Sequence, residues 1–337
     1  MGQRRRRRRS RAGVGHLLGV VSVVALTVVG CTDRDSDAPV TTSPAPSPAA
    51  AGGECGSFTI AYDSSNGYEA SAFIVGRIAS DELGCDVDYI DTTSRAAWRL
   101  VASGRADVYL DAFGSTDLQQ RLATPGGPVT ILGTNGILGG VDLLAPFFMA
   151  DRGLSSAPDL ADVRRIGWGR HRPSITTVPG LLALARSFVQ SQGLDYQVRT
   201  YSGPDGESGT SGLLQQVPRD DASRVANLYL AAAPRQFLGG GAGRQVVDIP
   251  ESGARSCTPH PATTLCSFDN FRYQKIVNSQ FAHSDSPAYT LVYNYRLSRA
   301  EAVNVLEIVA LSGYHVASAD AASWINTHRD VWRRWLE

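Results

Sequence analysis

The chain has 337 residues with 32 basic and 32 acidic side chains, so its formal net charge is zero. Seven of the 32 basic residues are arginines in the first 30 positions, where no acidic residue occurs. The other 25 basic and 32 acidic residues give the rest of the chain a net charge of about −7. This mildly acidic balance argues against a nucleic-acid-binding or anionic-membrane-binding protein.

The first 31 residues have the pattern of an export signal. Six consecutive arginines and Arg11 precede an uncharged apolar run of 16 residues, 14–29, and the segment ends in Val28-Val29-Gly30-Cys31. A basic start, an apolar centre and small residues before a cut are typical of a secretory signal peptide. A cut just before Cys31 resembles the bacterial lipoprotein signal, which implies a diacylglycerol on the Cys31 sulfur. The alternative is a plain signal peptide or a membrane anchor, although the apolar run is shorter than the ~20 residues of a spanning helix.

Residues 31–53 follow with no apolar periodicity. Their centre, Thr-Thr-Ser-Pro-Ala-Pro-Ser-Pro-Ala-Ala, is rich in residues that extend the chain and cannot build a core. We therefore expect residues 1–30 to be a lipoprotein signal peptide and residues 31–53 to be a disordered linker between the lipid and a globular part.

Four cysteines remain once Cys31 is assigned to lipid, and an even number in an exported chain suggests disulfides. Cys55 and Cys85 each precede a strand-like run, and adjacent parallel strands would bring their starts together. Cys257 and Cys266 would then close a proline-containing loop. Other pairings, free thiols or a metal site stay open, although the spacing fits no zinc pattern.

The region after Cys55 alternates between strand and helix patterns. We expect strands at 57–62, 87–90 and 108–110, with helices at 68–83 and from Thr93 or Ser94 to Ser103. The same order recurs later, with a short strand at 165–168, a helix at 178–190, and strands at 196–200 and 225–229. Alternation of this kind indicates parallel, doubly wound α/β sheets, and two such units suggest two lobes.

Ligands of open α/β sheets bind beyond the carboxyl ends of the strands. The stretches at these ends are Tyr62-Asp63, Asp111-Ala112-Phe113, Trp168-Gly169-Arg170 and the residues after Tyr229. No nucleotide or catalytic signature accompanies them. The glycine-rich stretch 239–243 lacks the Lys-Ser/Thr of a phosphate loop, and the histidines show no ligand spacing. We therefore expect a protein that is not an enzyme and uses no cofactor or metal.

Four short motifs occur in order along the globular part. They are Ala102-Ser103-Gly104-Arg105-Ala106-Asp107-Val108-Tyr109-Leu110-Asp111-Ala112-Phe113, Ser156-Ala157-Pro158-Asp159-Leu160, Gly193-Leu194-Asp195-Tyr196, and Ala322-Ser323-Trp324-Ile325-Asn326 continuing to Val331-Trp332-Arg333-Arg334-Trp335-Leu336. Each is similar to a block of the glycine betaine/choline substrate-binding proteins of ABC importers: L-A-S-G-D-(I/A)-D-V-(F/Y)-L-D-A-W, S-I-x-D-L, G-L-D-Y and A-x-x-W-(V/I)-x-x-N-P-x-x-V-x-x-W-L.

The resemblance implies a periplasmic-binding-protein-like α/β fold, with two doubly wound lobes joined by a hinge and a ligand cleft between them. Residues 54–144 and 240–337 would form lobe 1, and residues 145–239 would form lobe 2. It also implies a small quaternary ammonium ligand such as glycine betaine, choline or carnitine, and permease subunits in the membrane as partners. The protein would be a monomer held by lipid alone on the extracytoplasmic face of the cell membrane.

The family holds the trimethylammonium group of its ligands against aromatic faces. By this resemblance Phe113 stands at a cage position of the first lobe, and Tyr62-Asp63 match an aromatic–acidic pair. Trp168, with Gly169 and Arg170 after it, resembles a loop whose ring and N–H groups contact the ligand. The alternatives are a core role for Trp168 and turn or cap roles for Asp63 and Asp111.

One family motif is altered. The second-lobe block W-x-P-H-W reads Ala232-Ala233-Pro234-Arg235-Gln236 here, so a cage tryptophan is Ala232 and the histidine is Arg235. Arg235 could pair with a ligand carboxylate, and Tyr229 or Phe237 is a candidate for the missing ring. The change leaves a second hypothesis open, a two-lobed ligand-sensing or structural lipoprotein with a different ligand. Four further tryptophans are expected in the core: Trp98, Trp324, Trp332 and Trp335.

Overall fold

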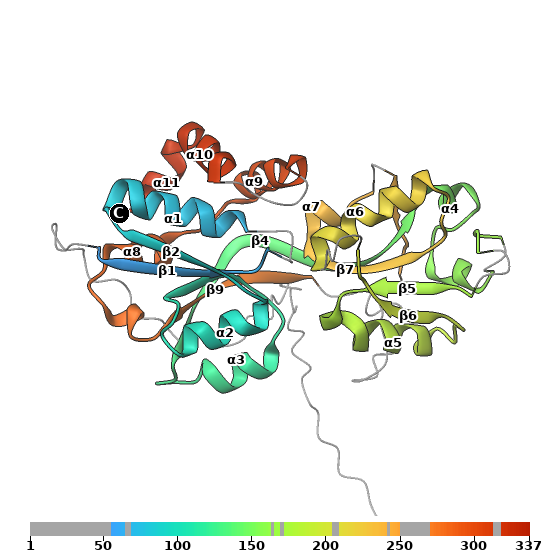
Figure 1. Ribbon diagram of the computed structural model, residues 1–337, viewed down its shortest axis with the longest axis horizontal. Helices are drawn as coiled ribbons and strands as arrows, with labels where there is room; N and C mark the ends of the chain where they lie inside the picture. The colour runs from blue at the N-terminus through green and yellow to red at the C-terminus, as the bar shows by residue number, and fades with distance from the viewer. Residues whose placement is uncertain are drawn as a thin grey trace, which may run out of the picture. The chain divides into compact units, whose positions relative to one another are not determined.

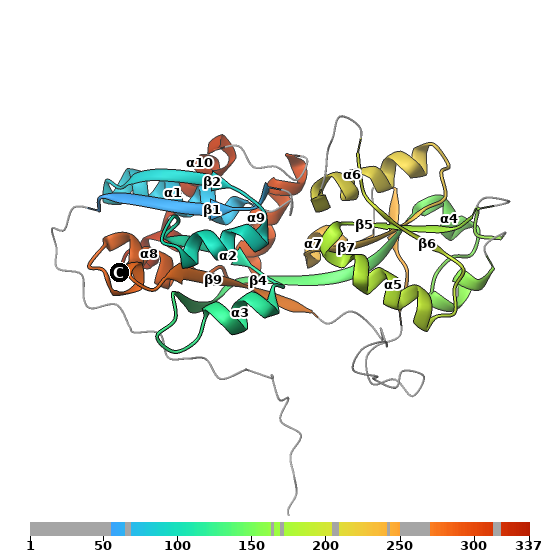
Figure 2. The ribbon, with the colours of Figure 1, turned by 60° about the horizontal axis from the view of Figure 1, so that its bottom comes forward.

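A computed structural model of the chain describes residues 55–64, 69–162, 165–168, 172–203, 209–240, 243–249, 270–312 and 318–337. Figures 1 and 2 show the ribbon from two directions. The predicted signal peptide, Cys31, the linker, Gly169, Arg170, Cys257 and Cys266 lie outside these residues. Within them, no helix combines the length and the apolar character needed to cross a membrane.

The described strands form one sheet of nine strands. They are β1 (Ser57–Tyr62), β2 (Asp86–Asp91), β3 (Val108–Ala112), β4 (Val129–Pro146), β5 (Ser174–Thr177), β6 (Gln197–Thr200), β7 (Leu228–Pro234), β8 (Arg244–Val246) and β9 (Phe271–Asn278). Their order is β2-β1-β3-β9-β4-β7-β5-β6, and β8 also pairs with β4. The long strand β4 lies between β2-β1-β3-β9, which we call the first half of the sheet, and β7-β5-β6, which we call the second half (Figure 1).

The α-helices are α1 (Ala70–Leu83), α2 (Ser94–Ala102), α3 (Thr116–Leu122), α4 (Phe147–Asp151), α5 (Leu182–Ser191), α6 (Gly209–Ala222), α7 (Arg235–Leu238), α8 (Pro287–Asn294), α9 (Arg299–Leu311), α10 (Ser318–Thr327) and α11 (Arg329–Trp332). In the first half of the sheet, α1 and α10 lie over one face and α2 and α3 over the other (Figure 1). The second half carries α6 on one face and α5 on the other.

Local signals place the first helices as the sequence predicts. Gly84 ends α1 with a left-handed φ of 67°, and its N–H donates to the carbonyl of Ala79. Thr93 caps α2, with its side chain accepting from the N–H of Ala96. The strands predicted at 57–62, 87–90 and 108–110 are β1, β2 and β3.

The sheet is mixed: it contains the parallel pairs that the alternation indicated, together with antiparallel pairs. β1 pairs in parallel with β2 and β3, and β5 pairs in parallel with β6 and β7. β9 runs antiparallel to β3 and to β4, and β4 runs antiparallel to β7. The two parallel groups are therefore joined through antiparallel strands whose direction the alternation pattern does not report.

Two strand predictions in the second half need correction. Residues 165–168 form a turn, because Gly167 has a φ of 123° that an extended strand does not accommodate. The strand predicted at 225–229 begins at Leu228 and continues to Pro234, while Val225 is 49% exposed. Apolar composition located this strand and did not define its ends.

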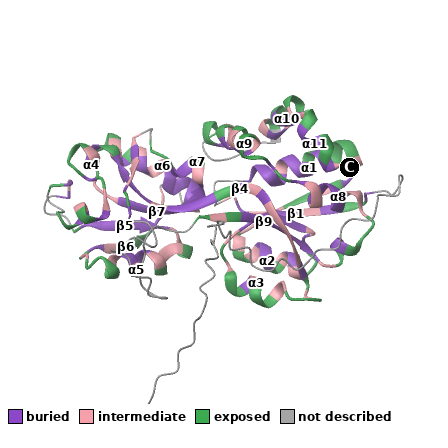
Figure 3. Cartoon of the chain, turned by 180° about the vertical axis from the view of Figure 1, so that it is seen from behind, coloured by how far each residue is buried: buried purple, intermediate pink, exposed green. Residues whose placement is uncertain are grey.

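The core of the described residues consists of three buried clusters. Figure 3 colours the buried residues purple. One lies under α1 and the C-terminal helices and continues to α6 and α7, a second surrounds α5 and the end of β4, and a third lies under α2. The four tryptophans expected in the core are 1–4% exposed, which confirms that prediction: Trp98, Trp324, Trp332 and Trp335.

The Cys55 and Cys85 sulfur atoms are bonded, with 4.8 Å between the two Cα atoms, which is the pairing the sequence predicts. The bond joins the residues that precede β1 and β2, which are neighbours in the sheet.

We expect removal of this bond to lower the free energy of unfolding by about 2–4 kcal/mol, because the unfolded chain regains the freedom of the closed loop. Cys55→Ala, Cys85→Ala and the double variant should lose the same amount in urea unfolding, since each breaks the one bond. Losses that add up in the double variant would contradict this expectation.

Candidate functional site

The carboxyl ends of strands from both halves of the sheet meet at Gly139 of β4. Gly139 pairs with Pro234 at the end of β7 on one side and with Phe271 at the start of β9 on the other. Because β9 is antiparallel to β3, its first residues lie beside the last residues of β3, where Ala112 pairs with Gln274. Ligands of α/β sheets bind at such carboxyl ends.

Three aromatic rings pack together at this junction. Phe113 and Phe271 are stacked, with centroids 4.8 Å apart and planes 11° apart. Tyr273 meets both rings nearly edge-on, at 5.1 Å from Phe113 and 5.3 Å from Phe271. Phe113 and Phe271 are partly exposed and contact buried clusters of both halves of the sheet, whereas Tyr273 is 1% exposed. We call these three residues the aromatic trio.

Two predicted carboxylates lie near the trio. Burial raises the pKa of Tyr273 well above its ordinary value, and the charges of Asp111, Tyr109 and Asp63 raise it further. Asp63 accepts a hydrogen bond of 2.5 Å from the N–H of Ser94 at the start of α2. It therefore accepts from the first N–H of α2, just after the end of β1, which is the cap role that the sequence left open.

Asp111 is buried in a network of side chains. Its Oδ1 accepts from the Ser71 hydroxyl at 2.7 Å and from the Asn135 amide at 2.8 Å, and the Tyr295 hydroxyl donates to Ser71 at 2.8 Å. Burial raises the pKa of Asp111 to about 7, although the bonds from Ser71 and Asn135 favour the carboxylate. At neutral pH this carboxyl lies near its midpoint of ionisation.

The Tyr62 ring packs against two other aromatic rings. It contacts Phe73 at 5.4 Å and Tyr89 at 6.5 Å, beside α1 and β2. Phe73 and Tyr89 are themselves 5.2 Å apart, so these three rings contact one another and leave no gap for a cation between them.

Trp168 and Tyr229 are both buried side chains. Trp168 is 3% exposed, packs edge-on against Tyr196 at 5.2 Å and belongs to the cluster around α5. Its indole N–H has no acceptor among the described residues. Tyr229 is 1% exposed and donates to Asp220 of α6. Phe237, the other candidate for the missing ring, is 2% exposed.

Arg235 lies on the other face of β4 from Phe271. Successive strand residues point to opposite faces; a Cβ on Gly139 would overlap the Phe271 ring, and a Cβ on Gly140 would overlap the Arg235 side chain. The Arg235 guanidinium donates from Nη1 to Asp142 at 2.6 Å and from Nε to Asn270 at 2.6 Å. This pair of bonds ties α7 to β4 and to the residue before β9.

Phe271 and Tyr273 are absent from the sequence prediction. The run Phe-Arg-Tyr-Gln at the start of β9 alternates between aromatic and polar residues, so period two puts Phe271 and Tyr273 on one face of a strand. That signal could have identified them as neighbours, but not as neighbours of Phe113.

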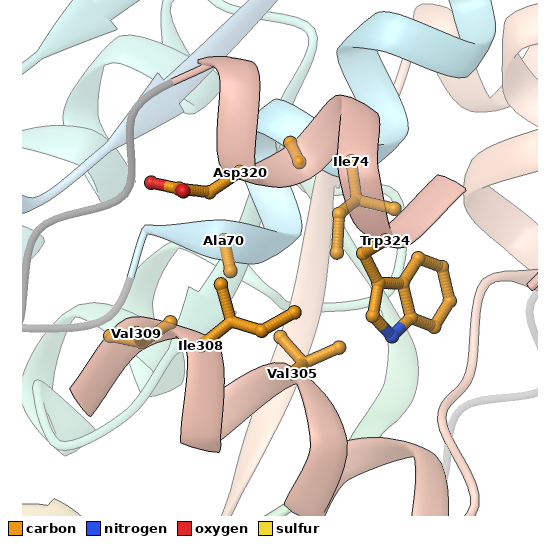
Figure 4. Close-up of a pocket in the computed structure, with 8 residues that line it drawn as sticks. Ala70, Ile74, Val305, Ile308, Val309, Asp320 and Trp324 are labelled. Atoms are coloured by element: carbon orange, nitrogen blue, oxygen red, sulfur yellow. The ribbon is translucent and has the colours of Figure 1, made fainter. Parts of the chain in front are cut away.

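A small apolar cavity lies elsewhere, among α1, α9 and α10 (Figure 4). Its lining includes Ile74, Val305 and Trp324, with Asp320 as the charged member, and none of the predicted ligand-binding residues. Among the described residues, no group of His, Cys, Asp and Glu side chains could hold a metal ion.

No protein-family model matches the chain, and no curated protein matches it by sequence. Solved structures match it in fold. Lactococcal OpuAC, closed around glycine betaine, aligns with a TM-score of 0.62 at 16% identity over 83% of this chain and 99% of its own. The glycine betaine/L-proline-binding protein ProX from Borrelia burgdorferi gives 0.61 at 14% identity, over 83% and 97%. An ABC-transporter choline-binding protein in complex with choline gives 0.60 at 16%, over 84% and 92%.

These comparisons confirm the predicted fold class, since the three matched proteins are binding proteins that share the architecture over most of their length. At 14–16% identity the likeness concerns the fold.

Trp168 has the surroundings of a core residue. We expect Trp168→Ala to lower the free energy of unfolding by about 3–5 kcal/mol, because it empties a packed site against Tyr196. Urea unfolding of the variant beside Tyr196→Phe, which keeps the packing ring, checks this. A loss below 1 kcal/mol would contradict the core role.

The raised pKa of Asp111 has a consequence for stability. Its ordinary pKa of 3.8 applies to the unfolded chain and about 7 to the folded protein. From about pH 4 to pH 7 the folded state retains a proton that the unfolded chain has released, so the free energy of unfolding falls as pH rises. Above pH 7 this contribution is constant.

Asp111→Asn removes this titration and keeps an oxygen acceptor for Ser71 and Asn135. We expect the free energy of unfolding of the variant, relative to wild type, to increase between pH 4 and pH 7, by at most about 1.4 kcal/mol per pH unit. Parallel stability curves for the two proteins in urea unfolding would show that Asp111 titrates normally.

Proposed function

We propose that the protein is an extracytoplasmic solute-binding lipoprotein of an ABC importer, which captures a small quaternary ammonium compound such as glycine betaine, choline or carnitine. The observation that carries the proposal is the aromatic trio, which lies where carboxyl ends of strands converge in the fold of binding proteins for such compounds.

The chemistry of the site supports a cationic ligand. A trimethylammonium group has no N–H to donate, so its attraction comes from aromatic faces and from nearby negative charge. Phe113 is partly exposed and offers such a face, and the charges of Asp63 and of ionised Asp111 act on Tyr273 of the trio. The site performs no reaction in this proposal; it binds and releases the ligand.

The export signal supports the remaining parts of the proposal. A lipid on Cys31 and a linker over residues 31–53 would keep the binding protein near a permease in the membrane. In this proposal the protein acts as a monomer and binds neither nucleic acid nor a cofactor.

The ligand assignment is tested by calorimetric titration of choline, glycine betaine and carnitine into the purified protein. We expect saturable binding of at least one of them. Phe113→Ala should weaken it about 2- to 30-fold, the range of one cation–π face, and Phe113→Tyr should retain it. Phe147→Ala is the matched control, since Phe147 is a phenylalanine that is 51% exposed and outside the trio.

The absence of heat for every quaternary ammonium compound would overturn the ligand assignment. That outcome would favour the second hypothesis, a ligand-sensing or structural lipoprotein of the same fold with a different ligand.

A further inference from the structure

The rings of the aromatic trio are stacked in layers on β4. Phe271 lies opposite Gly139 in the neighbouring strand, and three of its ring atoms would overlap a Cβ at that position. A ring that covers a glycine of the adjacent strand is a recognised way of filling the space left by the missing side chain. The Phe271 ring thus packs directly on the Gly139 backbone.

Phe113 forms the next layer. Its ring is stacked on Phe271 with nearly parallel planes, while Tyr273 stands edge-on against both rings. Tyr273 is buried in the core, so its ring has no room to move aside. The layers are therefore the β4 backbone at Gly139, then Phe271, then Phe113.

This order decides which ring can meet a ligand. With a spacing of 4.8 Å, the stacked faces of Phe113 and Phe271 are in contact and no trimethylammonium group fits between them. A cation can reach Phe113 only on the face turned away from Phe271. The orientation of that face depends on what lies behind it, since Phe113 stands just beyond the end of β3 and lacks ladder bonds there.

We infer that Phe271, packed against Gly139, is a positioning residue that holds Phe113 at the orientation needed to bind a quaternary ammonium cation. The inference rests on the proposed function, because it concerns the same ligand at the same ring. Phe271 itself makes no contact with the ligand in this arrangement. Gly139 is required because any side chain there would displace Phe271.

The test measures the affinity for choline and for 3,3-dimethylbutan-1-ol, which has the shape of choline with a carbon atom in place of the charged nitrogen. Cation–π attraction favours choline alone, whereas a general loss of shape affects both compounds. We expect Phe271→Ala and Gly139→Ala to weaken choline binding about 2- to 30-fold and to reduce the ratio of the two affinities.

Three controls separate positioning from folding. Phe271→Tyr keeps the ring and should restore the wild-type ratio. Gly180→Ala adds a methyl group where nothing lies within 4 Å and should change neither affinity. In the Phe271→Ala background, Gly139→Ala should have no further effect on choline binding, because the ring that packs on Gly139 has already been removed.

The outcomes are distinct. If wild type binds choline and Phe271→Ala binds it equally well with the same affinity ratio, the inference is wrong and the proposed function stands. Equal loss for both compounds would show that Phe271 only supports the fold, which also overturns the inference. If wild type binds no quaternary ammonium compound, the proposed function fails and takes the inference with it.

Discussion

The antiparallel pairing of β4 with β7 and with β9 is the constraint on which the site depends. Because β4 pairs with β7 and with β9, the end of β7 and the start of β9 face each other across Gly139. The antiparallel pairing of β9 with β3 then brings Phe271 and Tyr273 to the end of β3. Without these two reversals of direction, the rings of Phe113 and Phe271 could not meet.

Buried hydrogen bonds also connect β3, β4 and β9 to the helices around them. Asp111 of β3 binds Ser71 of α1 and Asn135 of β4, and Ser71 also accepts from Tyr295. Lys275 of β9, the only lysine in the chain, donates to the backbone carbonyls of Tyr295 and of two residues of α8. Buried polar groups are stable where their hydrogen bonds are satisfied, as they are here for Asp111 and Lys275.

Two adjacent glycines of β4, Gly139 and Gly140, face opposite sides of the strand. At Gly139 the strand receives the Phe271 ring, and at Gly140 it receives the Arg235 guanidinium on the opposite face. Arg235 is there paired with Asp142 and Asn270. The Arg235 guanidinium and the Phe271 ring therefore lie on opposite faces of β4.

Local patterns determined much of what the sequence predicted. The export signal and linker are patterns of composition, and the strand and helix positions from β1 to β3 follow from periodicity and helix caps at Thr93 and Gly84. The Cys55–Cys85 bond follows from two parallel strands that start side by side. Each of these features depends on residues that are close in sequence or on one simple pairing.

Only the tertiary structure decided which rings share the site. Phe113 was identified from its place at the end of a strand, but Phe271 and Tyr273 are more than 150 positions away, and Trp168 and Tyr229 turned into the core. Alternation along a strand shows which residues share a face. It does not show the direction in which the next strand runs, and that direction decides whether the start or the end of β9 lies beside Phe113.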